Sequence, residues 1–453
     1  MTAAKPGVTV PDDPDQCAPT SARGAEHRSS ATQMAIKLAR WMMSRPYVAV
    51  AIVAALGRVG FAITSFVLHD PGLFLDEVQY VGLATSVASG RGAEAWAPGY
   101  GQSLYDTTRA FMAPLTALFD LLGSSRLIGQ LWVATFGVAT AVATSLLAGR
   151  AAGSRAALLA GLAVALLPSQ ILWSSVVLRE SLVWFALVTI AWGMANWFDE
   201  TRSDFGAILA VTGGALTLGF TRVQTMLAAV WAVVLVVVVL RRSGYLARTA
   251  VALAVAVLVP VVVGIGPGGY DLVERAVPAL STTRTQLSAG ADSAFTATTL
   301  YRGSKPSDGD KPGGSSKTDQ DDRTVVQVDD ETAYVVEESI NANLRAVPRG
   351  AIATTVRPFP WETSSSFALR LAGFENIIWY VFYCLALAGC WFGRKQLEPL
   401  AFPMASTAAI LGVAFVTQGN LGTAFRHRGQ VFWAIAILSA VGLEHLLRRR
   451  SAE

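Results

Sequence analysis

The sequence of 453 residues has little charge, cysteine or histidine. Charged residues make up 15% of the chain, and there are three cysteines and four histidines. Cys384 and Cys390 lie six positions apart in one apolar segment, on different faces of a helix, which disfavours a disulfide or a metal pair. The third, Cys17, lies in a polar stretch. The histidines are scattered, so we expect no histidine-rich metal site, while a requirement for a divalent metal stays open.

Motifs of common soluble enzymes are also missing. The sequence contains no G-x-S-x-G, P-loop or H-E-x-x-H pattern. Gly264, Gly266 and Gly269 match G-x-G-x-x-G, but they follow an apolar run and open no βαβ unit, so we interpret them as the exit into a loop. The net charge of +4 is small and reflects membrane topology more than a nucleic-acid partner.

Long apolar runs dominate what is present, since 53% of the residues are hydrophobic. This composition predicts an all-α polytopic membrane protein with about ten transmembrane helices. The expected spans are 47–68, 127–148, 156–173, 181–197, 206–220, 224–240, 249–265, 375–392, 400–417 and 430–447. They form an N-terminal module, 47–265, and a C-terminal module, 375–453. The weakest are 156–173, which Pro168 interrupts, and the glycine-containing 206–220.

Basic residues orient these spans. Lys37, Arg40 and Arg45 precede the first span and place residues 1–46, expected as a disordered tail without a cleavable signal, in the cytoplasm. Alternation of the spans then places both termini on the cytoplasmic side of the inner (plasma) membrane. Two large segments fall outside: a first outer loop, 69–126, and a long loop, 266–374. We expect interfacial helices at 77–90 and 111–122, and disorder over the low-complexity stretch 303–332.

An acidic pair follows the first span, in FLDEVQY. Carboxylates at a membrane edge are costly and are functional by default. Asp76 and Glu77 could cap the interfacial helix that follows, because acidic residues favour a helix N-terminus. One of them could instead be a general base that takes a proton from an acceptor hydroxyl. Both roles can coexist, with either residue as the cap.

Several cationic residues fall at the same predicted face. Arg426, His427 and Arg428 precede the last span on its outer side, where positive charge is disfavoured. An anionic ligand would compensate for them, because guanidinium groups bind phosphate bidentately. Lipid headgroups or an acidic loop are the alternative. Arg222 sits alone in a tight hairpin and could simply reach the interface.

A second acidic residue has a basic neighbour. Arg179 and Glu180, at the outer start of the fourth span, could neutralise each other. Alternatively, Glu180 orients a substrate group while Arg179 faces phosphate. Arg58, inside the first span, is expected to face the bundle. Trp361, in RPFPWE, suits an interfacial anchor better than a sugar-stacking platform.

The order of these motifs resembles the GT-C superfamily of integral-membrane glycosyltransferases, and most closely the branch of protein O-mannosyltransferases and lipid A aminoarabinose transferases. The similar segments are FLDEVQYVGLATSVASGRG, SSRLIGQLWVATFGVATAVATSLLAG, LLAGLAVALLPSQILWSSVVLRESLVWFALV and FRHRGQVFWAIAILSAVGL. They cover roughly 47–240 and 375–447, and only D-E-x-x-Y is a sharp motif. The long insertion in the outer loop departs from the family pattern and leaves the acceptor open.

The resemblance implies an outward-facing site and a sugar donor linked to a polyprenyl phosphate. By position it implies that Asp76 is the catalytic base, with Glu77 and Tyr80 beside it. It further implies that the donor phosphate is held by Arg222, Arg426 and Arg428, with Glu180 in support. Tyr80, Arg179 and His427 are the other residues that we expect to bind substrate.

The chemistry agrees, because transfer from a sugar phosphate needs a base for the incoming hydroxyl and positive charge for the leaving phosphate. We therefore expect a membrane glycosyltransferase acting on an extracytoplasmic protein, lipid or glycan acceptor, by inversion. The alternatives are a transporter (flippase) or a polymerase of lipid-linked glycans. A transporter is less favoured, because no internal repeat is evident and the polar residues gather at one face.

Overall fold

The computed structural model describes residues 30–197, 204–240, 248–255, 301–303, 323–327, 333–337, 340–362, 367–394, 397–417 and 421–451. The chain divides into two compact units after Arg45. In the first unit, helix α1 covers Ser30–Ser44. This differs from the disordered tail expected over 1–46; residues 1–29 lie outside the described part. The helix forms because Met34, Leu38 and Trp41 recur at helical spacing, as in helices that lie on a membrane surface.

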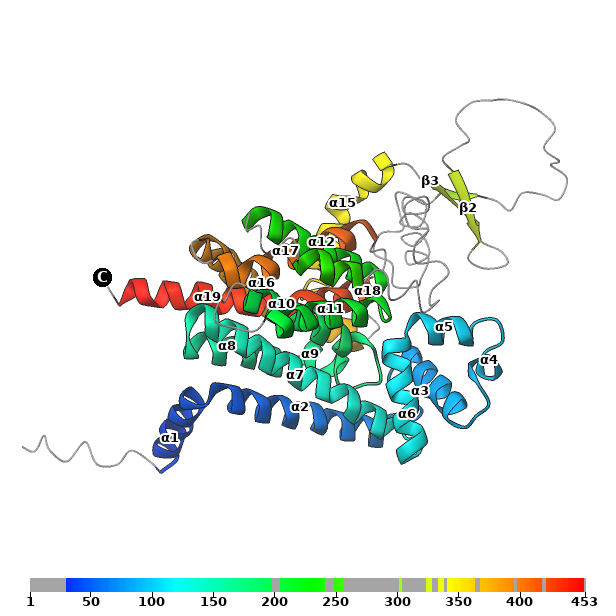
Figure 1. The fold of residues 1–453 in the computed structure, drawn as a ribbon, viewed down its shortest axis with the longest axis horizontal. Coiled ribbons are helices and arrows are strands. Elements are labelled where there is room, and N and C mark those ends of the chain that lie inside the picture. Colours follow the sequence, from blue (N-terminus) through cyan, green and yellow to red (C-terminus); the bar gives the residue numbers. More distant parts are fainter. Residues whose placement is uncertain are drawn as a thin grey trace, which may run out of the picture. The chain divides into compact units, whose positions relative to one another are not determined.

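The second unit is a bundle of helices (Figure 1). Its first half comprises α2 (Pro46–Leu68), α3 (Leu75–Ala88), α4 (Ala93–Trp96), α5 (Gly101–Thr107), α6 (Arg109–Leu122), α7 (Arg126–Ala152), α8 (Ser154–Leu166), α9 (Pro168–Trp173), α10 (Glu180–Trp197), α11 (Asp204–Gly219) and α12 (Val223–Leu240). Its second half comprises α15 (Ile340–Thr355), α16 (Phe367–Gly393), α17 (Leu397–Thr417), α18 (Leu421–Arg428), a 3-10 turn at Gly429–Val431 and α19 (Phe432–Arg450).

Six of the described helical segments are long and apolar enough to cross a membrane: Pro46–Leu68, Arg126–Ala152, Val223–Leu240, Arg370–Gly393, Glu398–Val416 and Ala424–Arg450. Ser154–Leu166 and Phe205–Gly219 are apolar but shorter. The chain is therefore a helical membrane protein. The expected number of ten spans stays a prediction, because the span at 249–265 is described only as far as residue 255.

Helix α19 is the central element of the bundle. It packs along α16 and also against α7 and α8, and 78% of its apolar window is buried, compared with 28% for α2. The contact with α16 is very close, because a Cβ added at Gly389 would come within 1.9 Å of the Leu438 carbonyl oxygen. Small residues permit such close backbone approach between membrane helices. The C-terminal helix thereby fixes the position of α18, which precedes it.

A proline and a buried arginine shape the third predicted span. Helix α8 ends at Leu166 and α9 begins at Pro168, since proline lacks the N–H that would continue the ladder. Arg58, which is fully buried on α2, donates hydrogen bonds to the carbonyls of Val164 (3.1 Å) and Ala165 (3.4 Å). The carbonyls freed at the break thus find donors inside the bundle, as membrane helices require. This confirms that Arg58 faces the bundle.

The two segments that we expect outside the membrane contain further structure. In 69–126, α3 and α6 confirm helices close to the stretches 77–90 and 111–122, and α4 and α5 lie between them. In the long loop, a three-stranded antiparallel sheet has the order β1 (Tyr301–Gly303), β3 (Ala333–Glu337), β2 (Arg323–Gln327). Strand β2 falls inside the stretch 303–332 that was expected to be disordered. Its β-branched run Thr-Val-Val favours a strand and explains the difference.

The RPFPWE segment lies between α15 and α16. Its aromatic rings are parallel, with the centroids of Phe359 and Trp361 5.0 Å apart, and Trp361 is exposed. An ion pair of 2.8 Å joins Arg357 to Glu362 and braces the turn. This geometry is compatible with an interfacial anchor and with a stacking platform, so both interpretations remain open.

Candidate functional site

Asp76 lies in the first turn of α3, yet it does not cap that helix. Helix α3 begins at Leu75 and its N-terminus receives no side-chain cap from Phe74. The Asp76 carboxylate instead forms an ion pair with Arg426 on α18, at 2.6 Å from Oδ2 to Nη1. Its side chain is 44% exposed. Residues 350 positions apart in the sequence therefore meet, and Asp76 keeps access to an incoming molecule.

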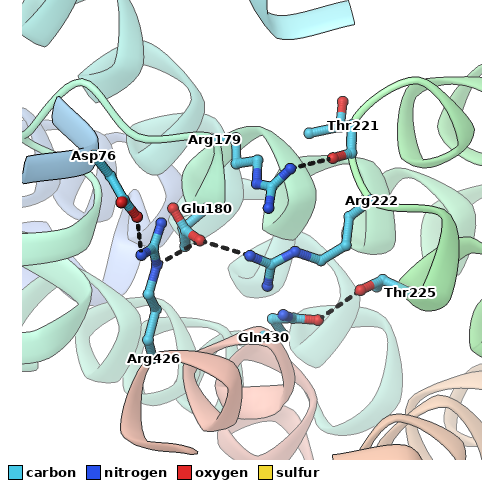
Figure 2. A network of polar contacts seen from close by, with 8 residues as sticks. All are labelled: Asp76, Arg179, Glu180, Thr221, Arg222, Thr225, Arg426 and Gln430. Atoms are coloured by element: carbon cyan, nitrogen blue, oxygen red, sulfur yellow. Dashed lines mark hydrogen bonds and ion pairs between the residues drawn. The ribbon is translucent and has the colours of Figure 1, made fainter. Parts of the chain in front are cut away.

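Glu180 is the centre of the cluster (Figure 2). It is the first residue of α10 and is fully buried. Its Oε1 accepts from Arg426 Nε at 2.6 Å and from Arg222 Nη2 at 3.0 Å. Arg222 lies in the hairpin between α11 and α12, so one carboxylate joins three separate parts of the chain. Buried ion pairs are weak evidence for stability, because desolvation offsets their attraction. Their gathering at one place points to function.

Arg179 adds a third guanidinium group at this place. Its Nη1 donates to the Thr221 carbonyl at 3.0 Å, beside Arg222. Arg179 Nε and Arg222 Nη1 are both buried and have no hydrogen-bond partner among the described residues. Buried donors without partners are costly. Three guanidinium groups (Arg179, Arg222 and Arg426) face two carboxylates (Asp76 and Glu180), which leaves one excess positive charge and unused donors that suit an anion.

The charge state of the cluster follows from its surroundings. Burial, with a further contribution from Arg179, lowers the pKa of Arg222 to about 10, while Glu180 opposes the change. Arg222 therefore stays charged at neutral pH. Burial also raises the pKa of the Tyr80 phenol above its usual value, and the neighbouring charges of Arg179 and Glu180 act on it in opposite senses. Tyr80 is thus a neutral hydroxyl beside the cluster.

A pocket opens next to the cluster and extends between α12 and α17. The pocket is small, with a volume of about 30 Å³. It is lined by polar side chains and by apolar ones: Arg222, Gln224, Thr225, His427 and Gln430, with Ala228, Ile410, Val413 and Ala414. A lining that combines a guanidinium group with apolar side chains suits an amphipathic molecule with an anionic head. His427 was expected at the site, and the structure places it in this pocket.

Glu77 has a different environment from Asp76. It is fully buried, and its carboxylate accepts hydrogen bonds from Leu73 N (3.0 Å), Gln130 Nε2 (2.8 Å) and Val177 N (3.2 Å). The bond to Leu73 resembles the reach-back of a capping box. Glu77 therefore ties α3 to α7 and to the segment before α10, while Asp76 faces the cluster. Of the two carboxylates, Glu77 is thus the one that braces the start of α3, through Leu73 N just before the N-cap residue Phe74.

Arg428 is also placed apart from the cluster. It is fully buried, donates to the Thr355 carbonyl at 3.2 Å and to Asn376 Oδ1, and stacks over Trp379 at 4.3 Å. These contacts anchor α18 to α15 and α16. The expectation that Arg428 holds a donor phosphate is not supported by this geometry: because α18 is helical, residues 426 and 428 point to different sides. Arg428 fixes the helix that carries Arg426.

Several residues near the cluster were missed by sequence reasoning. The Trp173 ring lies 5.8 Å from the Arg426 guanidinium, Thr225 donates to Gln430 Oε1 at 3.0 Å, and Gln130 holds Glu77. Gln130 and Gln430 are polar residues in or beside apolar spans, which is a signal for function that could have identified them. Trp173 carried no such signal. Among the described residues, no group of three or more His, Cys, Asp or Glu side chains could hold a metal ion.

Comparisons with known proteins bear on the fold. No family model and no curated protein matches the chain. A crystal structure of ArnT from Cupriavidus metallidurans, bound to undecaprenyl phosphate, is similar with a TM-score of 0.53 and 16% sequence identity. The similarity covers 93% of this chain, which spans 62% of the length of that protein. At this identity the likeness shows a shared fold alone.

Proposed function

We propose that this protein is a GT-C-type membrane glycosyltransferase that uses a sugar donor linked to a polyprenyl phosphate. The observation that carries the proposal is the convergence of Asp76, Glu180, Arg222 and Arg426, with unpartnered guanidinium donors buried beside an amphipathic pocket. Its support from outside the chain is the shared fold with a protein that binds undecaprenyl phosphate. The acceptor is a hydroxyl-bearing molecule on the extracytoplasmic side.

In the proposed reaction, the oxygen of the acceptor hydroxyl attacks the anomeric carbon of the donor sugar. The bond between this carbon and the phosphate oxygen breaks, and its electron pair leaves with the polyprenyl phosphate. Asp76, the exposed carboxylate, takes the hydroxyl proton. Arg222 and Arg426 stabilise the charge that develops on the phosphate. One displacement gives inversion, because the other carboxylates near the site, Glu77 and Glu180, are buried and held by the protein.

The lining of the pocket between α12 and α17 supports a donor of this kind. In the proposal, the donor phosphate binds beside Arg222 and His427, and the apolar side chains of Ala228 and Ile410 contact the start of the isoprenoid chain. Apolar contact along the chain adds affinity roughly in proportion to the area removed from water.

The proposal is tested by transfer from lipid-linked sugars in proteoliposomes. We expect wild-type protein to release polyprenyl phosphate from at least one donor of a panel in the presence of a cell-envelope extract as acceptor. Asp76→Asn should reduce the rate by about 10²- to 10⁴-fold, the contribution typical of a general base. Asp120→Asn, which removes an exposed carboxylate from the same loop, is the matched control and should keep full activity. Equal rates for Asp76→Asn and wild type would refute the base assignment.

A further inference from the structure

The two ion pairs of Arg426 bear on how the site is controlled. Arg426 is shared by two carboxylates through different nitrogens, since Nη1 contacts Asp76 and Nε contacts Glu180, each at 2.6 Å. Figure 2 shows its guanidinium group between them, with Arg222 on the far side of Glu180. The guanidinium group of Arg426, which the donor phosphate needs, is thus already paired with Asp76, the carboxylate that would act as the base.

The two contacts of Arg426 differ in strength. Glu180 is fully buried and is also held by Arg222, so its pairing is protected from solvent. Asp76 is 44% exposed and, in the part of the chain that the structure describes, makes a single ion pair. A partly exposed pair contributes less than a buried pair with further hydrogen bonds, because water competes for its groups. The contact between Asp76 and Arg426 is therefore the one that an incoming anion can replace.

The same contact also restrains the base. A carboxylate oxygen engaged with a guanidinium group at 2.6 Å has fewer lone-pair positions for a hydroxyl proton. A phosphate offers several charged oxygens that a guanidinium can bind with two parallel hydrogen bonds. The unpartnered donors of Arg179 and Arg222 lie at the same cluster, so a phosphate there gains contacts that Asp76 does not supply.

We infer that the donor phosphate replaces Asp76 as a partner of Arg426. Asp76 is therefore free to act as the base only when the donor is bound. Arg426 stays attached to Glu180 and turns Nη1 from the carboxylate to the phosphate. The donor consequently binds before the acceptor hydroxyl is activated. This inference rests on the proposed function, since it needs a phosphate-containing donor, but it adds a competition within the protein that a simple phosphate site lacks.

Affinity for a lipid phosphate tests the exchange, with farnesyl phosphate as the probe and purified full-length protein in nanodiscs. If Asp76 competes with the phosphate for Arg426, Asp76→Asn should bind the probe roughly three- to tenfold more tightly than wild type, although it has lost transfer activity. Asp120→Asn is the control for removing one negative charge from the same loop, and it should bind like wild type.

A double-mutant cycle separates exchange from repulsion through space. Arg426→Gln alone should weaken binding. Adding Asp76→Asn to Arg426→Gln should then change nothing, because no guanidinium remains to be released. If Asp76→Asn tightens binding by the same factor in both backgrounds, repulsion alone explains the gain and the exchange is refuted. If wild type binds farnesyl phosphate but Asp76→Asn binds equally well, the exchange fails and the proposed function stands. If none of the four proteins binds, both fail.

Discussion

Asp76 and Glu77 are neighbours in the chain, but the structure gives them opposite surroundings. Asp76 is partly exposed and faces Arg426, whereas Glu77 is buried and accepts bonds from two backbone N–H groups and one amide. Successive helical positions differ by about 100°, so two adjacent carboxylates cannot face the same place. The sequence predicted an acidic pair at the site, and the resemblance favoured Asp76 as the base, but the residues alone left open whether one of them braces the helix.

Glu77→Gln tests the structural role at the residue scale. Glutamine has the shape of glutamate, but it lacks the charge, and its amide NH₂ would face one of the N–H donors that now bind the carboxylate. A hydrogen bond to a charged group contributes about 1.5–3 kcal/mol, so we expect the free energy of unfolding to fall by roughly that amount. Thermal unfolding in detergent measures the change. Asp76→Asn changes a partly exposed side chain and should unfold at nearly the same temperature as wild type. The same loss of stability in both variants would contradict the division of roles.

Arg222→Lys tests the need for a guanidinium group. Lysine keeps the charge but cannot present two parallel N–H groups, and it leaves Glu180 with one fewer donor. We expect the KM for the lipid donor to rise about tenfold, a loss equivalent to about 1.4 kcal/mol. Steady-state kinetics measure this against Arg448→Lys, a control on an exposed side chain paired with Glu444 at the other end of α19. An unchanged KM would remove Arg222 from phosphate binding.

At the scale of elements, α18 brings Arg426 to the cluster because other helices hold it. Arg428 ties α18 to α15 and α16, and α19 follows directly after a single 3-10 turn. The sequence indicated the basic run 426–428, the apolar span that follows it, and the membrane face at which the basic run would lie. It could not indicate that Arg426 and Arg428 have different partners, since those come from residues 50 to 350 positions away.

Gly389→Ala tests the close contact that sets the position of α19. The added methyl group would overlap the Leu438 carbonyl oxygen, at 1.9 Å, and backbone cannot move aside as a side chain can. We expect a loss of about 3 kcal/mol or more, or a failure to fold. Gly412→Ala on α17 is the matched control, because nothing lies within 4 Å of its added Cβ. It should be neutral or slightly stabilising, as alanine favours a helix. Similar folding yields for the two variants would contradict the packing.

At the scale of the whole molecule, hydropathy predicted a helical membrane protein, and the charged residues predicted the membrane face of the site. Seven of the ten expected spans are helices of 18 or more residues in the described part of the chain, the seventh being α10, and the glycine- and proline-containing ones are shorter or broken. The short strands of the long loop were missed, because a low-complexity sequence between them obscured the local pattern. Distances between helices depend on packing over the whole chain, so the cluster itself could be predicted only as a shared face.

The orientation in the membrane remains a prediction that labelling can test. In a chain with its three cysteines replaced by serine, Asp120→Cys lies in the first outer loop and Ser451→Cys follows α19. The positive-inside rule places arginine-rich ends in the cytoplasm. A membrane-impermeant thiol reagent should therefore label Asp120→Cys in intact spheroplasts, and Ser451→Cys only after permeabilisation. The opposite pattern would place the candidate site in the cytoplasm.

A cryo-EM structure with a polyprenyl phosphate bound would show whether the arginine cluster holds the donor phosphate. We predict phosphate oxygens within about 3.2 Å of guanidinium nitrogens of both Arg222 and Arg426. We also predict that Arg426 Nη1 has moved away from Asp76 while its contact with Glu180 persists. A phosphate bound away from these arginines would contradict the proposed function. A bound phosphate with the contact between Asp76 and Arg426 intact would contradict the exchange.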